Sequence, residues 1–165
     1  MRWGHVMAAV AVGFLFALAS VAQDAKPAAA EPQWLTSFDA ASAEAQKSGK
    51  PILAYFTVGD SDPWSGPWCW KLCREVFDQK EFKEWAAKNV VLFELDFPFR
   101  KAQDDATKKA NADLAKKYKV EEFPTVIFMN PDGTQLGLTG YERGGPKPWI
   151  ENAQKILDAK KRAKT

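Results

Sequence analysis

An unbroken apolar run at residues 52–57 constrains the fold of this chain more than any other feature. It contains aliphatic and aromatic residues without polar alternation, which is typical of a strand covered on both faces. Such a strand needs helices on each side of its sheet, so the run predicts an α/β fold.

Further strands are predicted downstream. Residues 90–96 and 125–129 are apolar runs, and an Asn-Pro-Asp-Gly turn joins the second of them to residues 135–139. This last pair is expected to be an antiparallel hairpin. A crossover separates the first two strands, so they should be parallel. We therefore expect a central mixed β-sheet of about four strands.

Apolar residues at helical spacing predict the helices that cover both faces of this sheet. The expected helical segments are one marked by Trp34, Phe38, Ala41 and Ala45, one at about 67–77, one capped by Asp78 with Glu81 three residues later, one surface helix within 100–118, and a final amphipathic helix marked by Trp149, Ile150, Ala153 and Leu157.

The N-terminus has the pattern of a secretory signal peptide over residues 1–22, with Arg2, a short apolar run and a small-residue site. The run is shorter than the roughly 20 residues of a membrane span. We expect cleavage near Ala22 and a periplasmic or secreted protein, with membrane attachment only if the segment is retained. An alanine- and proline-rich flexible linker at 23–33 precedes a domain at 34–165.

Composition excludes several kinds of chemistry. Cleavage removes Arg2 and His5, the one histidine, and leaves 22 basic against 21 acidic residues, a net charge of +1. This balance gives no reason to expect a nucleic-acid partner. Without histidine, the mature chain cannot form a Ser-His-Asp triad, a Cys-His pair or a histidine-bearing metal site.

The chemistry is expected in residues 64–73, which hold both cysteines and follow the first strand. Cys69 lies two residues after Pro67, near the start of the predicted helix, where N–H groups and the helix dipole stabilise a thiolate. Cys73 lies one turn further on the same face. A bridge between them would require local distortion and would be readily reduced.

Other interpretations of the two thiols remain open. The cysteines of an exported protein can form a structural bridge. They can also be separate thiols, with Cys73 buried and inert. Two thiolates can bind the soft ion Cu(I), with Met129 as the available thioether.

Taken together, the chain resembles exported bacterial members of the thioredoxin superfamily, with an atypical Cys-x-x-x-Cys motif. The resemblance extends from about Trp34 to Leu157. The segments that carry it are 50–57, Trp68-Cys69, Cys73 with 75–77, 95–98, 120–125 and 130–133.

The resemblance implies a thioredoxin-like fold and a cis-proline at Pro124, facing the cysteines. In this family the backbone at that proline pairs with the bound substrate peptide. Phe123, Pro124 and Thr125, together with Trp68, are therefore the expected substrate-binding residues. Neither an organic cofactor nor a metal is implied.

The cysteine spacing departs from the family's Trp-Cys-x-x-Cys motif and leaves two registers open. If Trp68-Cys69 matches the family's Trp-Cys, Cys69 is the nucleophile and Cys73 is a displaced resolving thiol. If residues 75–77 set the register, Cys69 takes the resolving position and Gly66 takes that of the missing nucleophile.

We expect a thiol–disulfide oxidoreductase of the cell envelope that uses Cys69 and Cys73 as catalytic residues. Its partners would be protein or peptide thiols and disulfides, and an envelope redox protein. The alternative is a redox-inactive binding module with structural cysteines, followed by a Cu(I)-binding chaperone. Ala54, predicted to replace a buried acidic residue of many thioredoxins, favours slower exchange or a non-catalytic relative.

Overall fold

The structure, a computed structural model, describes residues 32–58 and 66–162. The predicted signal peptide and most of the predicted linker lie outside these residues. No helix of the described part is long and apolar enough to cross a membrane. The elements are β1 (Trp34–Leu35), α1 (Phe38–Ser48), β2 (Ile52–Thr57), α2 (Pro67–Leu72), the π-helical turn η1 (Cys73–Phe77), α3 (Lys80–Asn89), β3 (Val91–Asp96), α4 (Asp105–Lys117), β4 (Thr125–Met129), β5 (Gln135–Thr139) and α5 (Pro146–Arg162).

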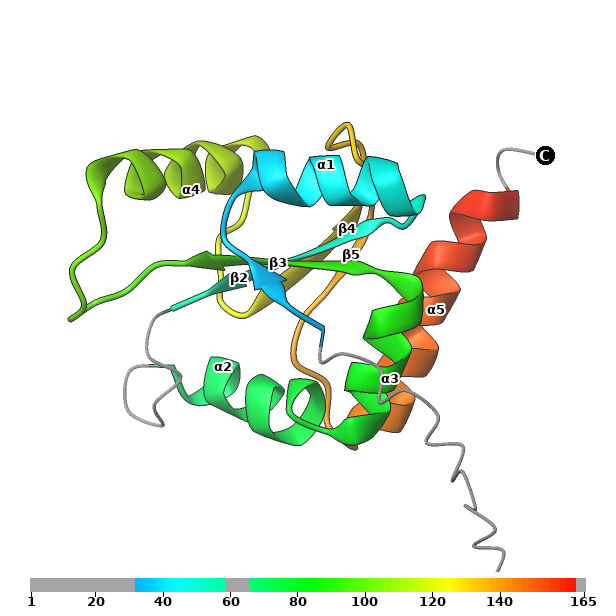
Figure 1. Cartoon of the computed structure of the whole chain (residues 1–165). Helices are drawn as coiled ribbons and strands as arrows, with labels where there is room; N and C mark the ends of the chain where they lie inside the picture. Colours follow the sequence, from blue (N-terminus) through cyan, green and yellow to red (C-terminus); the bar gives the residue numbers. More distant parts are fainter. Residues whose placement is uncertain (1–31, 59–65, 163–165) are drawn as a thin grey trace, which may run out of the picture.

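Five strands form one mixed sheet in the order β1-β3-β2-β4-β5. β2 is parallel to β3 and antiparallel to β4, and β4 and β5 form an antiparallel hairpin. Helices α1 and α4 cover one face, whereas α2, η1, α3 and α5 cover the other (Figure 1). The predicted mixed sheet with helices on both faces is therefore confirmed, with one strand more than the expected four.

The additional strand corrects the prediction that Trp34 belongs to the first helix. Trp34 lies in β1 and pairs with Leu92 of β3, while the helix begins at Phe38. Its ring packs 5.7 Å from that of Tyr55 and 5.3 Å from that of Phe77. The prediction places Trp34 in the helix from its spacing alone. A single aromatic residue can match the helical period of about 3.6 residues by chance.

The predicted N-cap of α3 is also wrong. The cap is Gln79, one residue after Asp78, and its side chain makes no capping hydrogen bond. The carboxylate of Asp78 instead accepts a hydrogen bond from Arg74 at 3.2 Å, on an exposed helix face. Because Arg74 lies one helical turn before Asp78, this ion pair competes with N-capping for the Asp78 carboxylate.

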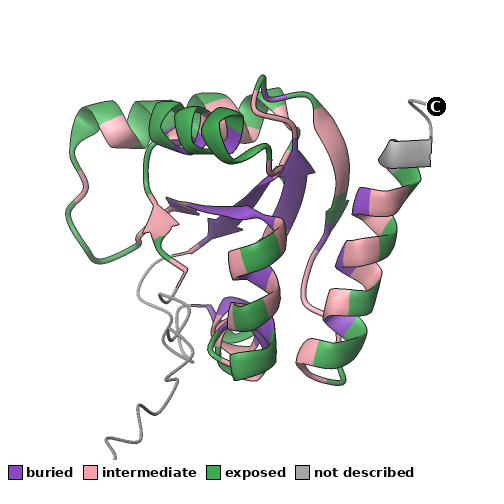
Figure 2. Cartoon of the chain, turned by 45° about the vertical axis from the view of Figure 1, so that its right-hand side comes forward, coloured by how far each residue is buried: buried purple, intermediate pink, exposed green. Residues whose placement is uncertain are grey.

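Every residue of β2 is buried, as its unbroken apolar run predicts. Alternate side chains enter two separate cores. Leu53 and Tyr55 pack with α2, η1, α3 and α5, whereas Ile52, Ala54 and Phe56 pack with α1 and α4. The central strands are the purple layer of Figure 2, between helices whose outer sides are exposed.

The strand directions bring the predicted site together at one edge of the sheet. The parallel register places Thr57 at the end of β2 beside Asp96 at the end of β3. In the antiparallel register, Thr125 at the start of β4 lies beside Phe56. The segments that follow β2 and precede β4 therefore meet at this edge.

Trp149 holds α5 against the sheet and gives a test of this packing. It is fully buried against Phe77 and Phe82, and its indole N–H donates to the carbonyl of Gly140 at 2.9 Å. We expect Trp149→Ala to lower the free energy of unfolding by about 3–5 kcal/mol in urea titrations. The control Leu138→Ala, at a side chain that is 59% exposed, should change it by less than about 0.5 kcal/mol. Equal losses in the two variants would contradict this packing role.

Candidate redox site

The cysteine helix starts in the way that the sequence predicts. Gly66 is the N-cap of α2, Pro67 is its first residue and Cys69 is its third. The carbonyl of Gly66 accepts the first helical hydrogen bond, from Trp70 N–H at 2.8 Å. Proline suits this position because the first N–H groups of a helix have no partner within it. Cys69 is nevertheless buried, with 1% of its surface exposed.

Cys73 marks a change in the helix. Its N–H bonds to the carbonyls of Cys69 and Trp70, and its own carbonyl accepts from Asp78 N–H, five residues on, at 2.8 Å. The predicted helix at about 67–77 is present, but its second half is a π turn. Single π turns within helices occur frequently at functional sites.

Tyr55 of β2 contacts both cysteines, each of which is a thiol. Its hydroxyl lies 3.4 Å from the carbonyl oxygen of Cys69 and 3.4 Å from Sγ of Cys73. Burial, and then the neighbouring Cys73, raises the pKa of Tyr55 far above its ordinary value. The hydroxyl therefore stays protonated at neutral pH.

Sequence reasoning missed Tyr55 and considered Ala54 instead. Successive strand residues face opposite sides of a sheet. Ala54 packs in the core with α1 and α4, away from the cysteine helix, whereas Tyr55 projects toward that helix. The alternation along β2 could have identified Tyr55, but the unbroken apolar run gave no sign of which residues face the cysteines.

The position of Gly66 bears on the two possible registers. A Cβ atom at Gly66 would lie 3.4 Å from Cβ of Cys69 and 2.8 Å from Cγ2 of Val58. Bonded cysteines have Cβ atoms about 3.5–4.5 Å apart. Residues four apart on a regular helix, such as Cys69 and Cys73, have Cβ atoms about 5–6 Å apart. The spacing at Gly66 is slightly below the disulfide range and requires Val58 to move, but it is nearer to that range than the regular Cys69–Cys73 spacing is.

The predicted substrate-binding segment lies at the start of β4. The Phe123–Pro124 peptide bond is cis, and Pro124 is buried. The ring of Phe123 packs 5.1 Å from that of Phe97, which follows β3. Thr125 donates its hydroxyl hydrogen bond to the carbonyl of Glu122 at 2.7 Å.

Trp68 lies on the outer side of the cysteine helix, with 48% of its surface exposed. Its ring is 5.5 Å from that of Tyr141, and Nζ of Lys71 lies 4.8 Å from its centre. The hydroxyl of Tyr141 donates to the carboxylate of Glu75 at 2.6 Å, which raises the pKa of Tyr141. Of the other tryptophans in the motif, Trp70 is half-buried and Trp64 lies outside the described residues.

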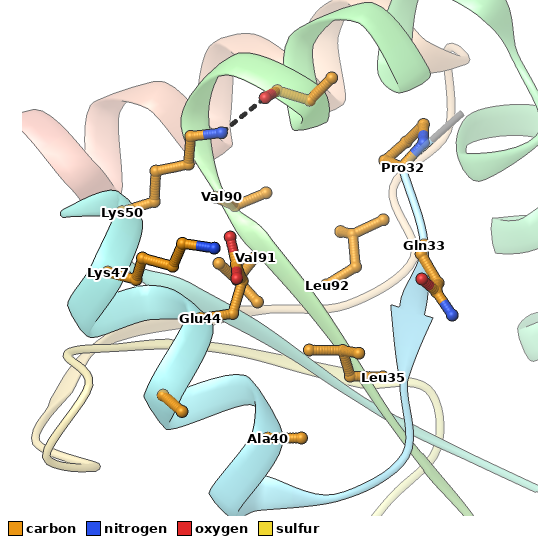
Figure 3. A pocket seen from close by; sticks show the side chains of 12 residues that line it. Pro32, Gln33, Leu35, Ala40, Glu44, Lys47, Lys50, Val90, Val91 and Leu92 are labelled. Carbon is orange, nitrogen blue, oxygen red and sulfur yellow. Dashed lines mark hydrogen bonds between the residues drawn. The ribbon is translucent and has the colours of Figure 1, made fainter. Parts of the chain in front are cut away.

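Two of the cavities among the described residues lie near the sheet and contain charged side chains. One, of about 290 Å³, is at the cysteine edge and includes Glu94, Asp96 and Lys101; burial, and then Asp96, raises the pKa of Glu94. The other, of about 520 Å³, lies between α1 and the start of β3 (Figure 3), where Nζ of Lys50 donates to the carbonyl of Ala87. Within the described part of the chain, no three His, Cys, Asp or Glu residues are placed to hold a metal ion.

The mixed five-stranded sheet, the cysteine helix after β2 and the cis-proline before β4 define a thioredoxin-like domain. The family model described as a thioredoxin-like domain matches residues 38–149. The chain belongs to this family.

Individual proteins that are similar to this chain include thioredoxin-related proteins. The chain is 32% identical over 136 residues to the disulfide bond reductase DsbH of Chlamydia pneumoniae, covering 82% of this chain and 79% of that protein. A solved structure of DsbH oxidoreductase superimposes with a TM-score of 0.73 at 30% identity, covering 83% of this chain and 92% of that one. The thioredoxin-related protein DsbJ of Chlamydia pneumoniae is 25% identical over 114 residues, which cover 67% of this chain but 32% of DsbJ.

The geometry at Gly66 predicts that a cysteine there will bond to Cys69. We expect Gly66→Cys with Cys73→Ser to form a disulfide on oxidation once Val58, whose Cγ2 would lie 2.8 Å and whose carbonyl oxygen would lie 3.2 Å from the new Cβ, has moved. Alkylation followed by mass spectrometry should find both thiols protected. The control Pro67→Cys with Cys73→Ser places the new thiol on an exposed residue that does not face Cys69. Two alkylated thiols in the oxidised Gly66→Cys protein would contradict the register.

Proposed function

We propose that this chain is a thiol–disulfide oxidoreductase of the cell envelope that acts on protein disulfides through Cys69 and Cys73. The observation that carries the proposal is the pair of thiols one helical turn apart, with the Tyr55 hydroxyl near Cys73. The similarity to a disulfide bond reductase over most of both chains supports it. The predicted leader at residues 1–22 supports action outside the cytoplasm.

The burial of the two thiols suggests an order of reaction that neither register gives, with Cys73 as the attacking thiol and Cys69 as the resolving one. Cys73 is half-buried, whereas Cys69 is enclosed. The Cys73 thiolate would attack one sulfur of the substrate disulfide, breaking that bond and forming a mixed disulfide. The released substrate thiolate takes a proton from solvent. Cys69 then attacks Cys73 in the mixed disulfide, and the second substrate thiol leaves.

The reaction transfers two electrons to the substrate and leaves a Cys69–Cys73 disulfide. A reduced dithiol of an envelope redox partner would return these electrons by the same exchange chemistry. Closing the bridge requires local movement of the helix, because the Cys73 N–H keeps the regular helical bond to the carbonyl of Cys69 and residues four apart on a helix have Cβ atoms about 5–6 Å apart.

The substrate polypeptide would bind beside the cysteine helix. Phe123, Pro124 and Thr125 supply backbone at the start of β4, on the sheet edge where α2 follows β2. The exposed ring of Trp68 supplies an apolar contact. Thiol–disulfide exchange between these groups needs neither a metal nor an organic cofactor.

A second function, as a redox-inactive binding module, is favoured by the glycine at position 66. The geometry there suits a partner for Cys69, and glycine supplies no thiol. In this role the exposed Trp68 and the segment around Pro124 would hold a polypeptide without reacting with it. Cys69 would then be a buried core residue of α2.

Insulin reduction distinguishes the two functions. We expect the wild-type protein to reduce insulin disulfides in the presence of a dithiol, and Cys69→Ser and Cys73→Ser each to lose this turnover because each removes one of the two exchanging sulfurs. Circular dichroism should show unchanged folding in both variants. The control Ser48→Ala changes a hydroxyl on the exposed end of α1 and should retain full turnover. A folded wild-type protein without turnover would exclude the oxidoreductase and favour the binding module.

A further inference from the structure

The Tyr55 hydroxyl is fixed in place beside the cysteine helix. The residue is 1% exposed, and its ring lies edge-on to Phe77 at 5.1 Å and 5.7 Å from Trp34. Since these aromatic rings hold the Tyr55 ring from β1 and η1, the hydroxyl has little freedom beyond rotation of its hydrogen. Two neighbours lie 3.4 Å from it, the Cys69 carbonyl and the Cys73 sulfur, and the buried hydroxyl of Thr57 on the same strand also interacts with it.

These two neighbours differ in what they can do. The carbonyl of Cys69 can only accept a hydrogen bond, whereas the sulfur of Cys73 donates as a thiol and accepts as a thiolate. With a Cys73 thiol, S–H can donate to the Tyr55 oxygen while the hydroxyl donates to the carbonyl. A Cys73 thiolate can only accept, and the Tyr55 hydroxyl is a donor within reach of it. Burial raises the pKa of Tyr55, so its proton remains available for this purpose.

We propose that Tyr55 is a positioning residue of the thiol pair: its hydroxyl turns from the Cys69 carbonyl to the Cys73 sulfur when Cys73 ionises, and so stabilises the attacking thiolate. The proton that Cys73 loses passes to solvent, and Tyr55 keeps its own. This role rests on the proposed function, in which Cys73 makes the first attack. Because the hydroxyl turns away from the Cys69 carbonyl, the ionisation of Cys73 also removes a hydrogen bond from the backbone of Cys69.

Other ionisable groups lie near this region on the cysteine helix and on β3. On the helix itself, Glu75 accepts a hydrogen bond from Tyr141, and Lys71 lies over the ring of Trp68. From β3, Glu94 lies beside Tyr55 in the parallel register, with Asp96 two residues further on the same face. A change confined to the Tyr55 hydroxyl leaves all of these groups in place.

Replacing Tyr55 with phenylalanine removes the hydroxyl and keeps the ring. In a Cys69→Ser background, which retains the residue 69 carbonyl, the rate of alkylation by iodoacetamide is measured against pH and reports on Cys73. We expect Tyr55→Phe to raise the midpoint of this profile by about one unit and to lower the rate at neutral pH roughly tenfold, since the thiolate loses a hydrogen-bond donor.

Tyr118→Phe in the same background is the matched control. This tyrosine packs on the opposite face of the sheet, where its hydroxyl donates to the carbonyl of Gly133 at 2.7 Å. The control should leave the alkylation profile unchanged. An equal shift in both variants, or no shift in Tyr55→Phe, would overturn the proposal.

The infrared S–H band of Cys73 in the Cys69→Ser background gives a second measurement without any reaction. Tyr55→Phe should move this band to higher frequency, because the thiol loses its acceptor, while Tyr118→Phe should not. If Tyr55→Phe shifts both the alkylation profile and the S–H band but the wild-type protein does not reduce insulin, Tyr55 acts on Cys73 as proposed. The same result excludes the oxidoreductase. Normal insulin turnover with neither shift would exclude Tyr55 alone.

Discussion

Strand β2 is enclosed on both faces, and the remaining elements are arranged around this burial. Its odd-numbered side chains need one set of helices and its even-numbered side chains need another, so the sheet must lie between two helical layers. The parallel pairing with β3 and the antiparallel pairing with β4 then determine which loops share an edge. The cysteine helix is the next described element after β2, and it begins at the edge where β4, with its cis-proline, also begins.

The aromatic cluster between the sheet and the cysteine helix connects stability with chemistry. Phe77 of η1 contacts Tyr55, Trp34 and Trp149, which belong to β2, β1 and α5. The rings that enclose Tyr55 also fix the orientation of its hydroxyl, which lies 3.4 Å from the Cys73 sulfur. The same burial keeps that hydroxyl protonated. A packing change in this cluster would therefore alter both the stability of the fold and the surroundings of Cys73.

Most of the fold could be predicted from the sequence, because its signals are local. Strand runs, the Asn-Pro-Asp-Gly turn and helical spacing depend on residues that are near neighbours in the chain, and the structure has the corresponding elements. β1 could not be predicted in this way. It is two residues long and is defined by its pairing with β3, more than fifty residues away. The N-cap of α3 was misplaced because Asp78 bonds back to Arg74 instead of capping.

The sequence by itself determined that the site contains two thiols on one helical turn after a buried strand, since the helical period places residues 69 and 73 together. Only the tertiary structure decided what surrounds them. Tyr55 reaches Cys73 across the packing of β2 against the helix, and Val58, which follows β2, lies beside Gly66 at the helix start. The change to a π turn at Cys73 is also not indicated by the helical spacing of the sequence. Local periodicity places the sulfurs, whereas contacts between distant segments set the burial and hydrogen bonds that govern their reactivity.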